Sequence, residues 1–187
     1  MGFLAGKKLL ITGVLSNRSI AYGIARACHR EGAELAFSYV GERFKERITE
    51  FAADFGSKLI FDCDVGSDEQ IAAMFKDLGA AWPTFDGFVH AIGFAPREAI
   101  AGDFLDGLSR ESFKIAHDIS AYSFPALAKA ALPVLVIKKK EPLPLRGSKP
   151  STYTVDSPRD ASGQKGGLFG GSRGGPGGAY FSSALHS

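Results

Sequence analysis

The stretch LLITGVLSNRSIAYG, residues Leu9–Gly23, decides the fold of this chain. It begins as a short apolar strand, turns at Gly13 into a polar loop, and enters a helix at Ser19. A strand that leads through glycine into a helix N-terminus is typical of a dinucleotide-binding unit, because the first helical N–H groups can bind a pyrophosphate. Gly23 would let the helix pack closely on the strand. The glycine spacing is longer than usual, so an ordinary serine-capped strand–turn–helix explains the stretch equally well on spacing alone.

The segments that follow repeat this alternation of strand and helix. Short apolar runs predict strands at 7–12, 34–39, 58–62 and 85–90. Amphipathic runs closed by glycine or proline predict helices at 19–31, 42–55, 67–81 and 109–132. Alternation with short connections predicts an α/β fold, a Rossmann-type doubly wound parallel sheet of about four to five strands. The sheet is expected to be incomplete, because the pattern stops at Pro133.

The chain changes character after Pro133. Residues 1–133 carry 14 Lys and Arg against 17 Asp and Glu, whereas residues 134–187 carry 8 against 3. The second segment is rich in Gly, Pro and Ser and has no sustained hydrophobic period. We therefore expect a domain boundary at residue 133, followed by an irregular, disordered and basic tail.

The carboxyl ends of parallel strands meet at one edge of the sheet, where folds of this kind bind their ligands. The candidate binding residues follow the predicted strands or cap the first helix: Gly13, Ser19, Val40, Asp64 and Ile92. Ser19 can cap that helix and leave its hydroxyl and the first helical N–H groups to face a phosphate. Asp64 either accepts from an adenine amino group or only caps a turn, and the residues leave both interpretations open.

The end of the second strand bears on which nicotinamide cofactor is bound. An acidic residue there favours an unphosphorylated ribose, and an arginine favours a 2′-phosphate. This chain offers the neutral Val40 followed by Glu42 and Arg43, so the residues do not decide between NADH and NADPH. His90, at the end of the fourth strand, is expected to be packed and hydrogen-bonded rather than catalytic.

Cysteine usage and hydropathy bear on the compartment. Cys28 and Cys63 have no metal-ligand spacing, so we expect reduced thiols and no metal site. No apolar run reaches the ~18 residues of a membrane span, and the N-terminus lacks the pattern of a signal peptide. We therefore expect a cytoplasmic protein whose partners include neither a membrane nor nucleic acid.

Four segments together carry a resemblance to a known family: GVLSNRSIAYGIA at 13–25, CDV at 63–65, HAIGFAP at 90–96 and FKIAHDISAYSF at 113–124. They resemble bacterial NADH-dependent enoyl-acyl-carrier-protein reductases, a divergent branch of the short-chain dehydrogenase/reductase family. The long glycine spacing is the form that this branch uses, and HAIG stands where ordinary short-chain dehydrogenases carry an Asn-Asn-Ala-Gly type of sequence. The resemblance covers residues 1 to about 133 and implies that they form an NAD-binding Rossmann domain.

The resemblance also implies a reaction and its partners. The family reduces the 2,3 double bond of an enoyl thioester on acyl carrier protein with NADH, and it assembles as a homotetramer whose main interface helix this chain does not contain. A tyrosine donates a proton to the developing enolate, and a lysine orients the cofactor ribose. Val40 stands where relatives commonly carry glutamine at the adenosine ribose. The implied NAD contacts are Gly13, Ser19, Ile20, Asp64, Val65 and Ile92, and the implied substrate contact is Ala95.

The family's tyrosine and lysine have the spacing Tyr-x6-Lys and follow the resembling segment. Residues 134–187 contain no such pair, so we expect no catalytic residue in this chain. A reading-frame slip is the favoured explanation. If the last base of each codon is read with the first two of the next, Asp156–Arg159 can encode Gly-Leu-Ala-Lys, and Ser151 with Thr152 can supply a tyrosine at the right spacing. The alternative is a natural tail, and the coding DNA decides between them.

Two functions therefore stay open at the level of sequence. The first is enoyl reduction in type II fatty-acid synthesis. The second is a non-catalytic NAD(H)-binding fragment, or a regulator with a basic tail. The two differ in the catalytic tyrosine and lysine, so we expect this chain to show no NADH-dependent reduction of a crotonyl thioester.

Overall fold

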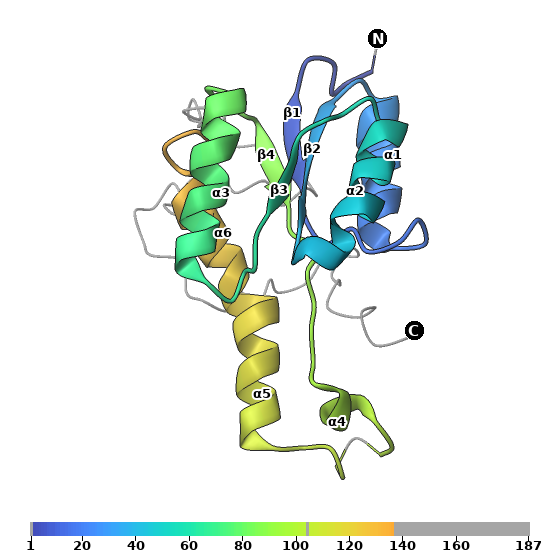
Figure 1. The fold of residues 1–187 in the computed structure, drawn as a ribbon, viewed down its shortest axis with the longest axis vertical. Helices are drawn as coiled ribbons and strands as arrows, with labels where there is room; N and C mark the ends of the chain where they lie inside the picture. Colours follow the sequence, from blue (N-terminus) through green and yellow to red (C-terminus); the bar gives the residue numbers. More distant parts are fainter. Residues whose placement is uncertain (1, 104, 137–187) are drawn as a thin grey trace, which may run out of the picture. The chain divides into compact units, whose positions relative to one another are not determined.

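The computed structural model describes residues 2–103 and 105–136, all of which belong to one compact unit. The predicted disordered tail and the proposed frame slip concern residues that lie outside this range, apart from residues 134–136. Four strands form one parallel sheet in the order β3-β2-β1-β4: β1 (Lys8–Ile11), β2 (Glu34–Tyr39), β3 (Ile60–Asp62) and β4 (Gly87–Val89). The predicted Rossmann-type parallel sheet is confirmed (Figure 1).

The helices are α1 (Ile20–Arg30), α2 (Glu42–Asp54), α3 (Asp68–Ala81), α4 (Arg97–Ile100), α5 (Arg110–His117) and α6 (Ser123–Ala131). All but α4 fall within the predicted helical ranges. Three of them begin at a serine, Ser19, Ser67 or Ser109, whose hydroxyl accepts from the N–H three residues on. Such caps satisfy helical N–H groups that have no partner inside the helix. The short helix α4 interrupts the segment after β4, which the sequence predicts as an irregular loop.

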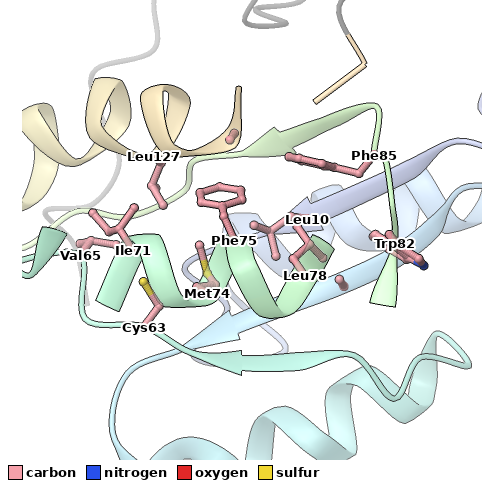
Figure 2. Close-up of a cluster of buried hydrophobic side chains, with 12 residues drawn as sticks. Leu10, Cys63, Val65, Ile71, Met74, Phe75, Leu78, Trp82, Phe85 and Leu127 are labelled. Carbon is pink, nitrogen blue, oxygen red and sulfur yellow. The ribbon is translucent and has the colours of Figure 1, made fainter. Parts of the chain in front are cut away.

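Helices cover both faces of the sheet, as is usual for a parallel sheet (Figure 1). Helices α1 and α2 lie on one face, and α3 and α6 lie on the other (Figure 1). Successive residues of a strand point to opposite faces, so Leu10 joins the cluster under α3 and α6 while Ile11 joins the cluster under α1 and α2. Figure 2 shows the first cluster, in which Phe75 and Leu78 of α3 pack near Leu10 and Phe85.

The predicted helix over 109–132 is present from Arg110 to Ala131, but a π-helical turn at Asp118–Tyr122, which was not predicted, separates α5 from α6. In this turn the N–H of Ser123 donates to the carbonyl oxygen of Asp118, five residues back. Pro125 lies in the first turn of α6 and has no N–H to donate, so the regular ladder is already interrupted there. Such widened turns frequently mark functional positions in helices.

Residues 134–136 continue the sheet on the outer side of β4. The N–H of Phe85 donates to the carbonyl oxygen of Val134 at 2.9 Å, and the N–H of Val136 donates to that of Phe85 at 2.8 Å, which makes a parallel bridge between Phe85 and Leu135. Residues 134–136 therefore belong to the same compact unit as the sheet. Among the described residues, no helix is long and apolar enough to span a bilayer.

Candidate functional site

The four strand ends come together at the carboxyl edge of the sheet. All strands run parallel, with Ile11 paired to both Phe37 and Val89, and Tyr39 paired to Asp62. The residues that follow these pairs are therefore placed side by side along the edge. The sequence-predicted Gly13, Val40, Asp64 and Ile92 all belong to this group.

Gly13 brings the end of β1 against the end of β4. Its φ is 80°, and a Cβ built on it would lie 2.0 Å from the carbonyl oxygen of Ala91. The fully buried Thr12 ties the same two strands, because its hydroxyl donates to the carbonyl oxygen of Val89 at 2.8 Å. A Cβ on Gly23 would meet no atom within 4 Å, so the predicted close packing at Gly23 is wrong and the close approach lies at Gly13.

Ser19 begins α1 at this edge. Its hydroxyl oxygen accepts from the N–H of Tyr22 at 3.2 Å, and its proton goes to the carbonyl oxygen of Ser16 at 2.7 Å. The predicted helix cap is confirmed, and the contact of the Ser19 hydroxyl with a phosphate stays a prediction. The N–H groups of Ile20 and Ala21 have no partner inside the helix. Ala21 is 1% exposed whereas Ile20 is 57% exposed, so the N–H of Ile20 is the group that an anion could reach.

Asp62, which the sequence did not indicate as a site residue, binds the backbone just after the end of β2. Val40 is 42% exposed, and the following Gly41 has a φ of 75°. The N–H of Gly41 donates to Oδ1 of Asp62, the last residue of β3, at 2.9 Å. The spacing of 21 positions between the two residues gives no local signal, since only the register of β2 on β3 brings them together.

Asp64, after β3, caps a turn. Its Oδ1 accepts from the N–H of Gly66 at 2.9 Å, and its own N–H donates to the Gln70 side chain at 2.9 Å. The turn-capping interpretation is confirmed, and the adenine contact stays a prediction. Val65 is 8% exposed and packs in the core under α3, and its contact with the cofactor stays a prediction.

His90 is packed and hydrogen-bonded, as predicted. Its Nε2 lies 2.7 Å from the hydroxyl of the buried Ser123, and its ring meets Phe124 edge-on. Ser123 gives its only hydroxyl proton to the carbonyl oxygen of Ile119 at 2.6 Å, so Nε2 of His90 is the donor in the pair. Burial lowers the pKa of His90 below its usual 6.5, which keeps the ring neutral at pH 7.

The segment after β4 is held by the π-helical turn. The N–H of Phe94 donates to the hydroxyl of Ser120 at 3.0 Å, and that hydroxyl donates to the carbonyl oxygen of Phe94 at 3.2 Å. Both backbone groups of one residue are thus bound by one side chain. Ile92 packs on the α3–α6 cluster, and Ala95 follows Phe94 as a half-buried residue.

One Tyr-x6-Lys spacing does occur in the described residues, at Tyr122 and Lys129. The Tyr122 hydroxyl is 3.4 Å from a carboxylate oxygen of Asp68. Lys129 lies in the last turn of α6, just before the residues that pair with Phe85 at the amino end of β4. The lysine therefore lies toward the edge of the sheet opposite the strand ends, and the pair does not complete the site.

Comparison with known proteins decides the family. A profile described as enoyl-(acyl carrier protein) reductase matches residues 13–143. The chain belongs to this family. The family resemblance seen in the sequence is thereby confirmed, and the match extends past the predicted boundary at residue 133.

Curated relatives match one part of the chain. Enoyl-[acyl-carrier-protein] reductase [NADH] FabI of Neisseria meningitidis is 62% identical over 135 residues, which are 72% of this chain and 52% of that protein. The Escherichia coli protein of the same description is 58% identical over the same shares. The chain spans about half the length of the curated relatives it matches.

Solved structures of the family share the fold. The enoyl-[acyl-carrier-protein] reductase (NADH) of Aquifex aeolicus superposes with a TM-score of 0.69 at 50% identity, over 72% of this chain and 57% of that one. The enoyl-(acyl-carrier-protein) reductase of Anaplasma phagocytophilum, solved in complex with NAD, gives a TM-score of 0.67 at 38% identity, over 72% and 51%.

Proposed function

We propose that this chain carries the nucleotide-binding part of an NADH-dependent enoyl-acyl-carrier-protein reductase. The observation that carries the proposal is the carboxyl edge of the sheet, where the glycine turn at Gly13 and the start of α1 lie beside the ends of the other strands. The family membership and the NADH named for the 62% identical relative support the same cofactor.

The residues present fit a dinucleotide. There is no room for a side chain at Gly13 between the ends of β1 and β4, so only backbone occupies this part of the carboxyl edge. The amide of the exposed Ile20 would bind the pyrophosphate, and the ends of β2 and β3 at Val40 and Asp64 would hold the adenosine. Ile92, after β4, would pack on the cofactor, and Ala95 would contact the substrate. Bound NADH would supply a hydride for the 2,3 double bond of an enoyl thioester.

The proposal extends to partners and compartment. We assign an enoyl thioester on acyl carrier protein as substrate and a homotetramer as the family's assembly. Exposed apolar residues on α5 and α6, Phe113 and Phe124, are compatible with contacts to further protein. The free thiols of Cys28 and Cys63 are compatible with the reducing cytoplasm.

The test is NADH binding to the purified 187-residue chain, followed by cofactor fluorescence. Ile20→Glu places a carboxylate at the start of α1, where it favours the helix but repels a pyrophosphate. We expect binding by the unchanged chain, and a loss of at least about tenfold in affinity for Ile20→Glu. Ala27→Glu adds the same charge at an exposed position two turns along α1 and should bind normally.

Two results would count against the proposal: no NADH binding by the unchanged chain, or equal binding by Ile20→Glu and Ala27→Glu. A separate assay with a crotonyl thioester addresses the reaction itself. We expect no turnover, because the described residues place no tyrosine–lysine pair at the strand ends. NADH binding without turnover supports the non-catalytic alternative for this chain, and turnover supports the enzyme.

A further inference from the structure

Asp62 joins the end of β3 to the end of β2. It lies opposite Tyr39 in the parallel register, and its Oδ1 accepts from the N–H of Gly41 at 2.9 Å. Gly41 is the turn residue between β2 and α2, with a φ of 75°. Dinucleotide-binding folds take the adenosine ribose at the end of this strand. Asp62 therefore controls the backbone at the place where the two nicotinamide cofactors differ.

The other charged side chains after β2 are already engaged. Glu42 forms an ion pair with Lys45 at 2.9 Å. The guanidinium of Arg43 lies over the ring of Phe44, 4.6 Å from its centroid. Arg43, which the sequence offered as a partner for a 2′-phosphate, thus lies on the ring of Phe44, and the neighbouring Glu42 is paired with Lys45.

We propose that Asp62 is a specificity-determining residue that selects against a 2′-phosphate on the adenosine ribose. It occupies the N–H of Gly41, which a phosphate at this turn would otherwise use as a donor. It also fixes a negative charge at the same turn, and that charge repels a phosphate dianion. The inference rests on the proposed function, because it takes the strand-end edge as the nucleotide site.

The experiment compares nucleotide pairs that differ only in the 2′-phosphate. AMP and adenosine 2′,5′-bisphosphate probe the adenosine half alone, and NADH and NADPH probe the whole cofactor. Affinities are measured by calorimetry for the full 187-residue chain and three variants. Asp62→Asn keeps a side-chain oxygen for Gly41 and removes the charge, Asp62→Ala removes both, and Asp77→Asn removes a charge from an exposed position on α3.

We expect Asp62→Asn to shift the preference toward the 2′-phosphorylated nucleotide of each pair by about fivefold, the size expected of a unit charge acting on a dianion through water. The shift should shrink when salt is raised to about 0.5 M, because ions screen exposed charges. Asp62→Ala should shift the preference further, since the Gly41 N–H becomes free. Asp77→Asn should leave both pairs unchanged.

Hydrogen exchange at the Gly41 amide supplies a readout that needs no nucleotide. It should be slow in the unchanged chain and in Asp62→Asn, and fast in Asp62→Ala. A fast Gly41 amide in the unchanged chain, a preference unaltered in Asp62→Asn, or an equal shift in Asp77→Asn would each overturn the inference while leaving the proposed function intact. Failure of all four nucleotides to bind would overturn the proposed function, and the inference with it.

Discussion

Replacing Gly13 by alanine tests whether the close approach of two strand ends holds the candidate site together. The φ of 80° is a left-handed conformation that costs a residue with a Cβ about 1–2 kcal/mol. The added Cβ would lie 2.0 Å from the carbonyl oxygen of Ala91, and backbone must move to relieve the overlap. Overpacking of this kind costs about 1–3 kcal/mol. We expect the free energy of unfolding to fall by about 2–5 kcal/mol, a large share of an ordinary domain's stability.

Two other glycines separate these contributions. Gly56 has a φ of 67°, and a Cβ there would meet no atom within 4 Å, so Gly56→Ala should cost only the conformational part, about 1–2 kcal/mol. Gly23 lies inside α1 with open space around it, so Gly23→Ala should raise stability by about 1 kcal/mol. Urea unfolding followed by circular dichroism gives all three values. If Gly13→Ala costs no more than Gly56→Ala, the contact with Ala91 does not constrain the fold and the reasoning is refuted.

Three further predictions concern single side chains. Ser120→Ala removes the hydroxyl that binds both backbone groups of Phe94, so the Phe94 amide should exchange at least about tenfold faster by NMR; unchanged exchange would contradict this. Burial lowers the pKa of His90 below 6.5, so the unfolded chain binds the proton more readily than the folded chain as the pH falls. The free energy of unfolding should therefore decline below about pH 6.5. His90→Gln should flatten that decline, as measured by urea unfolding between about pH 5 and 7. Burial raises the pKa of the Cys63 thiol to about 12, so an alkylating reagent at about pH 8 should modify the half-buried Cys28 first, and equal rates would argue against the packing of Cys63.

The order of strands and helices could be predicted because each element has a local signal. The β2 range 34–39 agrees with the prediction at both ends, since an apolar run lies there between Gly32 and Gly41. The serine caps of α1, α3 and α5 are read from the sequence in the same way. The strand ends then follow from chain direction alone, which is why Gly13 and Asp64 fall at the same edge.

The links between elements could not be predicted. Hydrogen bonds across 21, 26 and 33 positions join Asp62 to Gly41, Ser120 to Phe94 and His90 to Ser123, respectively. Each depends on a strand register or on the rotation of a helix, and no periodicity in the sequence specifies either. The π-helical turn is an intermediate case, because Pro125 cannot donate to a regular helical ladder and is a local signal that the prediction of a helix over 109–132 did not use.

The two buried clusters imply an order of assembly. The cluster under α1 and α2 draws its buried residues from Ile11 through Phe55, whereas the cluster under α3 and α6 joins Leu10 to Leu127 and Ala131. Closing a loop of roughly a hundred residues costs more chain entropy than closing the short loops of the first cluster. During synthesis on the ribosome, the α1–α2 face can therefore condense while the opposite face of the same sheet still waits for α6. The nascent chain passes through a stage with one apolar face bare, and that stage is when it is most exposed to aggregation and to capture by chaperones.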